Sequence, residues 1–296
     1  MGANLKEVRE RIRSVISTQQ ITKAMKMVSA AKLRRAQQAI VQLRPYSQKL
    51  EAMMGSIMAN IDGGDATSSY GVAREINSVL MVVVTSNRGL CGAFNTNIIK
   101  SAVQTINTKY AAQRDAGKLT ILCIGKRGND YFRRRDYKMI SDYVEIFSDL
   151  SFDNVSQVPN RLMAEFTSKK YDAIEISYGR FKNAAMQFAE TEQFLPVAKV
   201  APVKGASTKK VNYAFEPNEA ELLEDLIPNI LQVQFQKCLL DTHASEHGAR
   251  MTSMDKATEN ADEMLKALKI HYNKARQEAI TKELSEIVGG AAALNG

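Results

Sequence analysis

The sequence has little of several things that define large classes of protein. It contains no tryptophan, three cysteines and six prolines in 296 residues. Three widely spaced cysteines cannot form a disulfide framework and favour reduced thiols in the cytosol. The longest apolar run, residues 79–84, is far shorter than the roughly 20 residues that span a bilayer. The charged N-terminus lacks the apolar core of a secretory signal. These absences exclude a membrane-spanning, secreted or disulfide-stabilised protein.

Charge is distributed unevenly along the chain, although the net charge is only +8. Residues 1–50 carry 11 basic and two acidic side chains, whereas residues 217–296 carry eight basic and 13 acidic ones. A basic segment often indicates nucleic-acid binding, so a nucleic-acid-binding coiled coil is one candidate function. Mutual pairing of the two oppositely charged ends is the simpler interpretation. No aromatic residue that could stack on bases precedes Tyr46.

Residues 1–61 are predicted to form one long helix. From Leu5 to Ile61, alternate steps of three and four residues meet 17 positions, of which 12 are apolar. This is the pattern of a coiled-coil seam. Four of the five polar positions are consecutive, from Gln19 to Ser29, and the apolar residues there shift to Ile21, Met25 and Val28. We therefore expect a local fault in the seam, and then a flexible linker over residues 62–75.

Residues 216–296 are predicted to form a second long helix, with a kink at Pro228. Its three-four pattern includes Met254, Ala257, Ala261, Met264 and Leu268. If the two helices pack antiparallel from a common base, paired residue numbers add to about 275. The second helix would then overshoot the first from about Asn273, and Met25 would lie opposite Arg250. Such a rod buries little surface by itself, so it needs a sleeve of other chains.

Residues 76–215 are predicted to form one Rossmann-like α/β domain. Strand-like runs at 78–85, 119–124, 140–147 and 172–178 alternate with helical runs at 93–114 and 154–170. This alternation is typical of a mostly parallel sheet covered by helices. Residues 187–200 are predicted to add an antiparallel edge strand. The predicted fold is thus a long antiparallel coiled coil with a central α/β domain.

Four segments resemble the gamma subunit of bacterial rotary (F-type) ATP synthases. They are ITKAMKMVSAAK at 21–32, TSNRGLCG at 85–92, SEHGARM at 245–251 and ITKELSEIVGGAAA at 280–293. The resemblance covers essentially the whole chain. The terminal segment fits the family pattern at every constrained position, whereas His247 and Gly248 are local differences.

The resemblance implies a central shaft that catalyses no reaction itself and needs neither cofactor nor metal. Its implied partners are the alpha and beta subunits of the catalytic head, the epsilon subunit and the membrane c-ring, with one copy of this chain per complex. The implied location is the cytoplasmic face of the bacterial inner membrane, as a peripheral subunit. By resemblance, Met25 and Arg250 would meet an acidic loop of beta. Arg276, Gln277 and Thr281 would form a second contact higher on the shaft.

Two further motifs suggest chemistry, but each has a simpler interpretation. His243 and His247 stand in an H-x-x-E-H pattern that binds zinc in some proteases. A rod helix offers neither the third ligand nor the substrate cleft that a zinc hydrolase needs. Cys91 follows a strand at a predicted helix start, where a thiol can be activated. No histidine lies in the middle domain to act as its base, so Cys91 is predicted to be a packed small residue.

Overall fold

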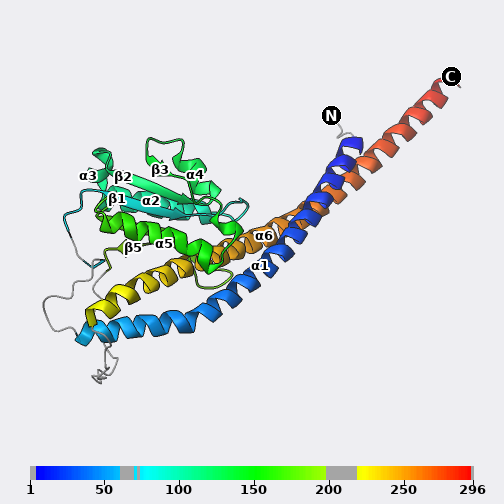
Figure 1. Ribbon diagram of the computed structural model, residues 1–296. Coiled ribbons are helices and arrows are strands. Elements are labelled where there is room, and N and C mark those ends of the chain that lie inside the picture. The colour runs from blue at the N-terminus through cyan, green and yellow to red at the C-terminus, as the bar shows by residue number, and fades with distance from the viewer. Residues whose placement is uncertain (1–4, 61–69, 72–73, 198–218, 295–296) are drawn as a thin grey trace. The chain divides into compact units, whose positions relative to one another are not determined.

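The computed structural model describes residues 5–60, 70–71, 74–197 and 219–294, and it divides the chain into two compact units. One unit comprises residues 1–29 and 251–296, and the other comprises residues 30–250. Two long helices, α1 (Leu5–Asn60) and α6 (Glu219–Leu294), each contribute to both units (Figure 1). Most of the predicted linker at 62–75, and the segment 198–218 with the predicted end of the edge strand, lie outside the described residues.

In the first unit, α1 and α6 form the predicted antiparallel pair, but the register differs from the prediction. Arg9 donates a hydrogen bond to Tyr272, and the Thr22 and Thr258 hydroxyls lie 2.8 Å apart. Lys26 binds Asp255. Paired numbers therefore add to 280 or 281 instead of 275, which puts Met25 at the level of residue 256 and not of Arg250. The predicted register was wrong because it assumed that α1 ends beside the first residues of α6, which shifts the pairing by about six residues.

The seam between the helices is polar where a fault was predicted. Thr22 and Ser29 keep their inward positions and are buried. Ile21 and Val28, which were expected to replace them, are each 57% exposed. The prediction of a shifted apolar stripe was therefore wrong. Hydrogen bonds from Gln19, Thr22 and Lys26 to α6 join the helices here, and the three-four spacing of inward positions continues.

The α6 helix extends beyond the described part of α1, as predicted. Met254, Ala261 and Ala275 are the buried positions of α6 in this unit, whereas Met264, predicted to lie in the seam, is 50% exposed. Every residue from 280 to 291 is exposed. The helix runs without interruption through Pro228 and through Gly289–Gly290 to Leu294. An extended stretch of α6 is therefore left without a neighbouring helix among the described residues.

In the second unit, a five-stranded sheet has the order β3-β2-β1-β4-β5. The strands are β1 (Val79–Val84), β2 (Leu119–Ile124), β3 (Lys138–Ile140), β4 (Ala173–Phe181) and β5 (Gln187–Leu195). Strands β1 to β4 are parallel, and β5 is the predicted antiparallel edge strand. The sheet thus confirms the predicted mixed α/β architecture.

The strand predicted at 140–147 is wrong over most of its length. Only Lys138–Ile140 pairs with β2, and the chain then turns into a short 3-10 helix, η1 (Ile146–Ser148). Ile146 is buried in the core, and Tyr143 and Phe147 pack against it. The apolar residues of this segment therefore serve core packing from a loop and not from a strand.

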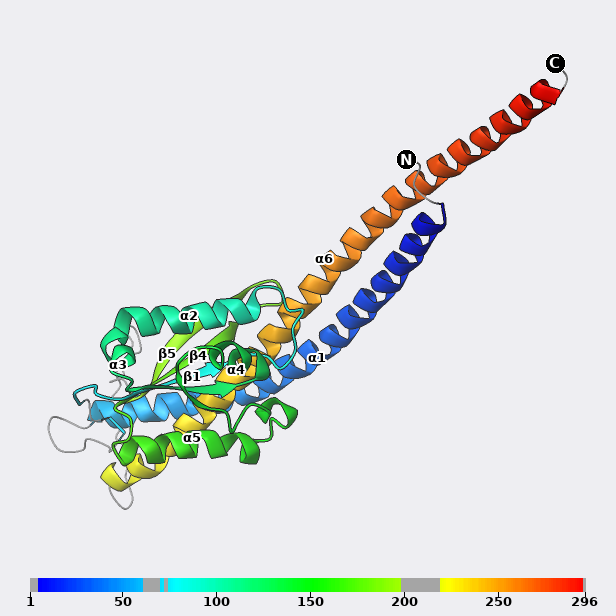
Figure 2. The same cartoon turned by 90° about the horizontal axis from the view of Figure 1, so that it is seen from above.

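Helices cover both faces of the sheet (Figure 2). On one face, α5 (Phe152–Thr167) and part of α6 contribute Leu162, Phe166, Phe235 and Leu239 to the core. On the other face, α2 (Phe94–Lys109) and α4 (Lys126–Phe132) contribute Ile98, Ile106 and Phe132. The helix predicted at 93–114 is divided at Tyr110, after which α3 (Ala111–Asp115) begins. The seven-residue α4 was not predicted, because it is short and contains Gly128.

None of the helices in the described part of the chain is both long and apolar enough to span a membrane.

Candidate functional site

The residues predicted to contact partners fall into two groups in the structure. Met25, Arg276, Gln277 and Thr281 belong to the helix-pair unit. Met25 is half-buried, and the other three are exposed on the extended part of α6. The Thr281 hydroxyl donates to the Gln277 carbonyl oxygen at 2.9 Å, so only its acceptor lone pairs remain available. These side chains carry no catalytic arrangement, and their exposure suits contact with another protein.

Arg250 belongs to the second unit and is only 6% exposed. Its Nε donates to the Gly89 carbonyl oxygen at 3.2 Å, and its Nη2 donates to the Arg88 carbonyl oxygen at 3.0 Å. Nη2 also forms an ion pair with Glu246 at 2.7 Å. The guanidinium therefore joins α6 to the loop that follows β1. The sequence did not predict this role, because no local pattern brings residues 89 and 250 together.

The loop that receives Arg250 is held in a fixed shape by its own hydrogen bonds. The Ser86 hydroxyl donates to the Arg88 carbonyl oxygen at 2.6 Å, and the Ser86 amide donates to Asn95 Oδ1 at 2.9 Å. Leu90 has a φ of 62°, which is an uncommon value for a residue with a side chain. Both carbonyl groups that Arg250 binds therefore belong to a turn whose conformation is fixed by hydrogen bonds within the loop.

Cys91 lies in the same loop and is buried, as predicted for a packed small residue. Burial raises the pKa of its thiol, while the nearby Arg250 and the Ser86 hydroxyl act in the opposite direction. Asn95 Nδ2 donates to the sulfur at 3.2 Å. A thiol with a raised pKa carries little thiolate at neutral pH and is a poor nucleophile. The activation that a helix start could provide is outweighed by burial.

The His243–His247 pair is hydrogen-bonded to Arg250 and is a poor zinc site. Arg250 Nη1 lies 3.2 Å from His247 Nδ1, and His247 Nε2 lies 3.1 Å from His243 Nε2. Because a guanidinium can only donate, His247 Nδ1 must accept, and its Nε2 therefore carries the proton that His243 accepts. Both Nε2 atoms are committed to this bond and not free to bind a metal. In the described part of the chain, no group of three or more His, Cys, Asp or Glu side chains is arranged to hold a metal ion.

Both histidines are neutral in the folded protein. Burial, together with the nearby cations Lys32 and Arg250, lowers the pKa of His243 to about 4. Burial lowers the pKa of His247 to about 3, assisted by His243 and Arg250. Glu246 has a raised pKa because burial outweighs the opposing effect of Arg250. The only strong charge pairing in this cluster is therefore the one between Arg250 and Glu246.

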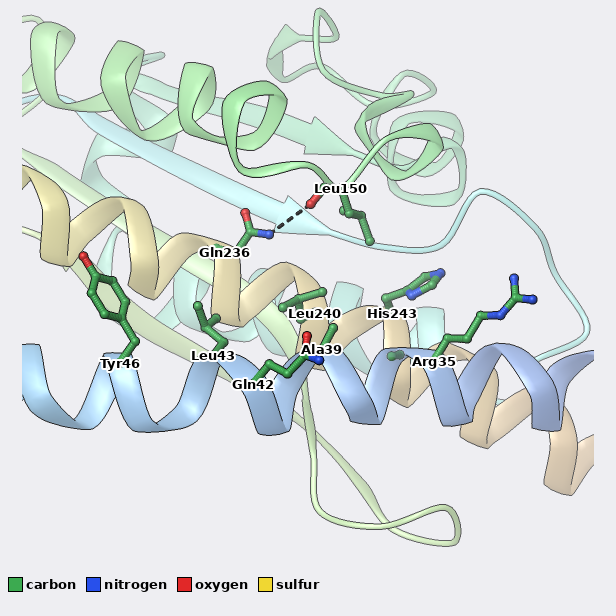
Figure 3. A pocket seen from close by; sticks show the side chains of 10 residues that line it. Arg35, Ala39, Gln42, Leu43, Tyr46, Leu150, Gln236, Leu240 and His243 are labelled. Carbon is green, nitrogen blue, oxygen red and sulfur yellow. Dashed lines mark hydrogen bonds between the residues drawn. The ribbon is translucent and has the colours of Figure 1, made fainter.

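A groove of about 490 Å³ lies between α1 and α6 in the second unit (Figure 3). Its walls are mainly aliphatic, with Leu43, Leu150 and Leu240 among them, and Tyr46, Arg35 and His243 also line it. The Gln236 amide donates to the Leu150 carbonyl oxygen at 3.0 Å. The groove contains no carboxylate pair or activated nucleophile, so its chemistry suits packing of another side chain and not catalysis.

Comparison with known proteins gives the family directly. The sequence model described as ATP synthase matches residues 4–294. The chain is 52% identical to the ATP synthase gamma chain of Cytophaga hutchinsonii, over 99% of each protein. The chain belongs to the ATP synthase gamma-chain family. A further gamma chain, from Christiangramia forsetii, is 51% identical over 99% of this chain and all of that protein.

The solved structures that are similar agree with this fold. A chain of the Euglena gracilis mitochondrial ATP synthase has a TM-score of 0.68 at 23% identity and covers 99% of this chain and 95% of its own. A chain of the Tetrahymena thermophila central stalk and c-ring structure has a TM-score of 0.54 at 22% identity, covering 80% of this chain and 99% of its own. At these identities the match supports the fold alone.

As a member of the gamma-chain family, the protein is the central-stalk subunit of an F-type ATP synthase and not a catalytic subunit. The exposed surface of α6 and the buried contacts of Arg250 are therefore features of a non-catalytic subunit. Thr242 and Ser245, which also bond to the α/β domain, were not identified from the sequence. The only sequence signal for them is a pair of small hydroxyl residues three apart on α6, and they stand among the polar residues Asp241, His243 and Glu246.

Proposed function

We propose that this gamma chain is the shaft that couples rotation of a membrane c-ring to ATP synthesis in the beta subunits. In this proposal, alpha and beta subunits form the sleeve around the helix pair, and the α/β domain rests on the c-ring together with epsilon. The complex contains one copy of the chain. It lies on the cytoplasmic face of the bacterial inner membrane, where this chain is a peripheral subunit.

The observation that carries the proposal is the uncovered apolar surface of α6. Ile270 is 72% exposed, Ile287 67% and Val288 66%. Ile280 and Leu284, at 47% and 57%, lie between them on the same helix. Large apolar side chains concentrated on one exposed helix mark a surface that another protein covers. A sleeve of alpha and beta subunits would bury these residues.

The charge of α1 supports an acidic partner. Of the 11 basic residues in the first 50, ten are exposed, and Lys26 alone is half-buried. The ion pair of Lys26 with Asp255 joins the two helices, and the other ten basic side chains leave α1 with an exposed basic surface. Acidic loops of the beta subunit would find a complementary surface here.

We propose Met25, Arg276, Gln277 and Thr281 as contacts with the catalytic head. Arg276 can donate two hydrogen bonds to a carboxylate, whereas Gln277 and Thr281 make neutral, weaker bonds. Contacts of modest strength favour rotation because each must break at every step. A shaft shifts the beta subunits between states only if its faces bind those states unequally. The exposed Ile21 and Val28 on one side of α1 contribute to such inequality.

The proposal is tested by purification of the assembled complex through a tag inserted within residues 62–71. Native mass measurement should give three copies each of two larger subunits per copy of this chain, together with ATPase activity. Recovery of the chain with nucleic acid, and a steep dependence of that binding on salt, would instead support the nucleic-acid-binding alternative. Recovery of the chain alone would contradict both functions.

A further inference from the structure

The carboxyl ends of β1 and β4 meet at the point where the sheet reverses its order. From β1 the chain proceeds to β2 and β3 on one side, and then to β4 on the other. In open α/β sheets, the crevice at this switch point is the usual place for a ligand. Here side chains of α6 bond to the backbone near these strand ends, and all of the groups involved belong to the second unit.

Two hydroxyl groups of α6 complete the hydrogen bonding of β4. The parallel pairing of β1 with β4 ends at Val83 and Ser177, which leaves Gly179 beyond it. The Gly179 amide donates to Thr242 Oγ1 at 3.2 Å, and the Gly179 carbonyl oxygen accepts from Ser245 Oγ at 3.0 Å. Thr242 and Ser245 are both fully buried. The helix therefore bonds to strand backbone where the neighbouring strand has ended.

Arg250 makes the corresponding bonds on the β1 side. It donates to the carbonyl oxygens of Arg88 and Gly89, in the loop directly after β1. The ion pair with Glu246, one turn earlier on α6, balances its charge in this buried place. Three positions over two turns of α6 thus hold the ends of two neighbouring strands. We call Thr242, Ser245 and Arg250 the strand-end joint.

We propose that the strand-end joint transmits torque between the α/β domain and α6, and that Arg250 acts as a positioning residue within it. The hydrophobic effect is non-directional and does not by itself set the rotation of a helix. Hydrogen bonds are directional and weaken steeply when donor and acceptor turn away from each other. The joint therefore fixes the rotational setting of α6 against the sheet. This inference rests on the proposed shaft function. It identifies the contacts that hold α6 against the sheet of the α/β domain.

The test compares three variants in the assembled complex: Arg250→Lys, Arg250→Gln and the double variant Thr242→Val with Ser245→Ala. The control is Ser253→Ala, which removes a hydroxyl from the same helix at a half-buried site outside the joint. A probe on the α/β domain reports its angular fluctuation while the head is fixed to a surface. We expect the variance to rise at least twofold in Arg250→Gln and in the double variant, less in Arg250→Lys, and not in the control.

The double variant separates the joint from direct contact with the head. Since Thr242 and Ser245 are fully buried, their loss cannot remove a contact with another subunit. An increase in angular variance with normal subunit stoichiometry and normal ATPase rate supports the joint. Parental variance in an intact complex of the double variant would overturn it. Failure of the unmodified chain to assemble with larger subunits would instead overturn the proposed function.

A measurement on the free full-length chain tests the joint whether or not the variants assemble with other subunits. Hydrogen exchange at the Gly179 amide reports the Thr242 bond directly, because an amide exchanges only when its bond opens. We expect exchange there to be about tenfold faster in the double variant, with no change in the exchange of β2. Equal exchange in parent and variant would overturn the joint without bearing on the shaft function.

Discussion

The hydroxyl groups of Thr22 and Thr258 lie 2.8 Å apart across the interface between α1 and α6. Each also has a carbonyl acceptor on its own helix, Gln19 for Thr22 and Met254 for Thr258. A hydroxyl has a single proton, so two protons serve three acceptors. The lateral contact is therefore made at the expense of a bond within one helix. This contact joins the helices with modest strength, and both hydroxyl groups have a partner.

Replacement of both threonines by valine should not destabilise the chain. Valine keeps the branched shape, and removal of both partners together leaves no unpaired group behind. We expect the free energy of unfolding in urea to be unchanged or to rise by up to about 1 kcal/mol. Thr22→Ala, which also removes a buried methyl group, is the matched comparison and should be less stable than the double valine variant. A loss above about 1 kcal/mol in the double variant would show that the seam contributes more than its geometry suggests.

Met25→Lys should weaken coupling in the complex while leaving assembly intact. Met25 is half-buried beside Lys26, so an added ammonium group at residue 25 would reach the surface and bind an acidic loop of the head too firmly. We expect protons pumped per ATP hydrolysed to fall about twofold, on the scale of one extra surface ion pair. Met25→Leu, which adds no charge, serves as the control. Equal pumping ratios in the lysine variant and the parent would refute this role for residue 25.

Stability should fall in acid because of the buried histidines. The pKa of His243 is lowered to about 4 and that of His247 to about 3, against an ordinary value of 6.5. The unfolded chain therefore binds protons that the folded chain does not, and stability decreases as pH falls from about 6.5 toward these values. The cations Lys32 and Arg250 contribute to lowering both pKa values, and Arg35 lines the groove beside His243.

Urea unfolding between pH 7.5 and 4.5 measures this dependence. Each histidine contributes up to about 1.4 kcal/mol per pH unit below 6.5. The variant His243→Gln removes one titrating group and should flatten the slope by up to that amount. His271→Gln, which changes an exposed histidine on the same helix, is the control and should keep the parental slope. The same slope in parent and His243→Gln would mean that His243 is not held neutral.

The sequence predicts the architecture well where a pattern is local. The long helices, the edge strand β5 and the exposed overhang with Arg276 and Gln277 all follow from periodicity and resemblance. The seam from Gln19 to Ser29 was misjudged, because periodicity assigns inward positions to apolar residues. Here, polar side chains pair across the interface instead, and hydrogen bonding between two distant segments is not visible in either segment alone.

The strand-end joint could not be predicted for a related reason. By resemblance, Arg250 is expected to meet an acidic loop of beta, and no local pattern around it predicts that its side chain is buried in this chain. Its burial depends on two backbone carbonyl groups near residue 89 and on the ion pair with Glu246. Likewise, Thr242 and Ser245 find their partner in Gly179, more than 60 residues earlier. Only the sheet topology brings these positions together.

Gly179→Ala tests how tightly the joint is packed. A methyl group on Gly179 would lie 2.6 Å from Cε2 of Phe94 and 3.4 Å from Ser245 Cβ. Phe94 is itself buried and cannot move away without disturbing the core. We expect the free energy of unfolding to fall by about 1–3 kcal/mol, the usual cost of overpacking, with faster hydrogen exchange in β4.

Gly290→Ala is the matched control for that variant, because it makes the same chemical change. Gly290 lies inside α6, and apart from the neighbouring backbone of that helix no atom of the described residues lies within 4 Å of the new methyl group. Alanine there should strengthen the helix locally by about 0.8–1 kcal/mol and leave β4 unaffected. Both substitutions restrict the unfolded chain equally, so the difference between them isolates the folded-state contact. Equal stability of the two variants would mean that the Phe94 ring can move away from a methyl group at Gly179 without cost.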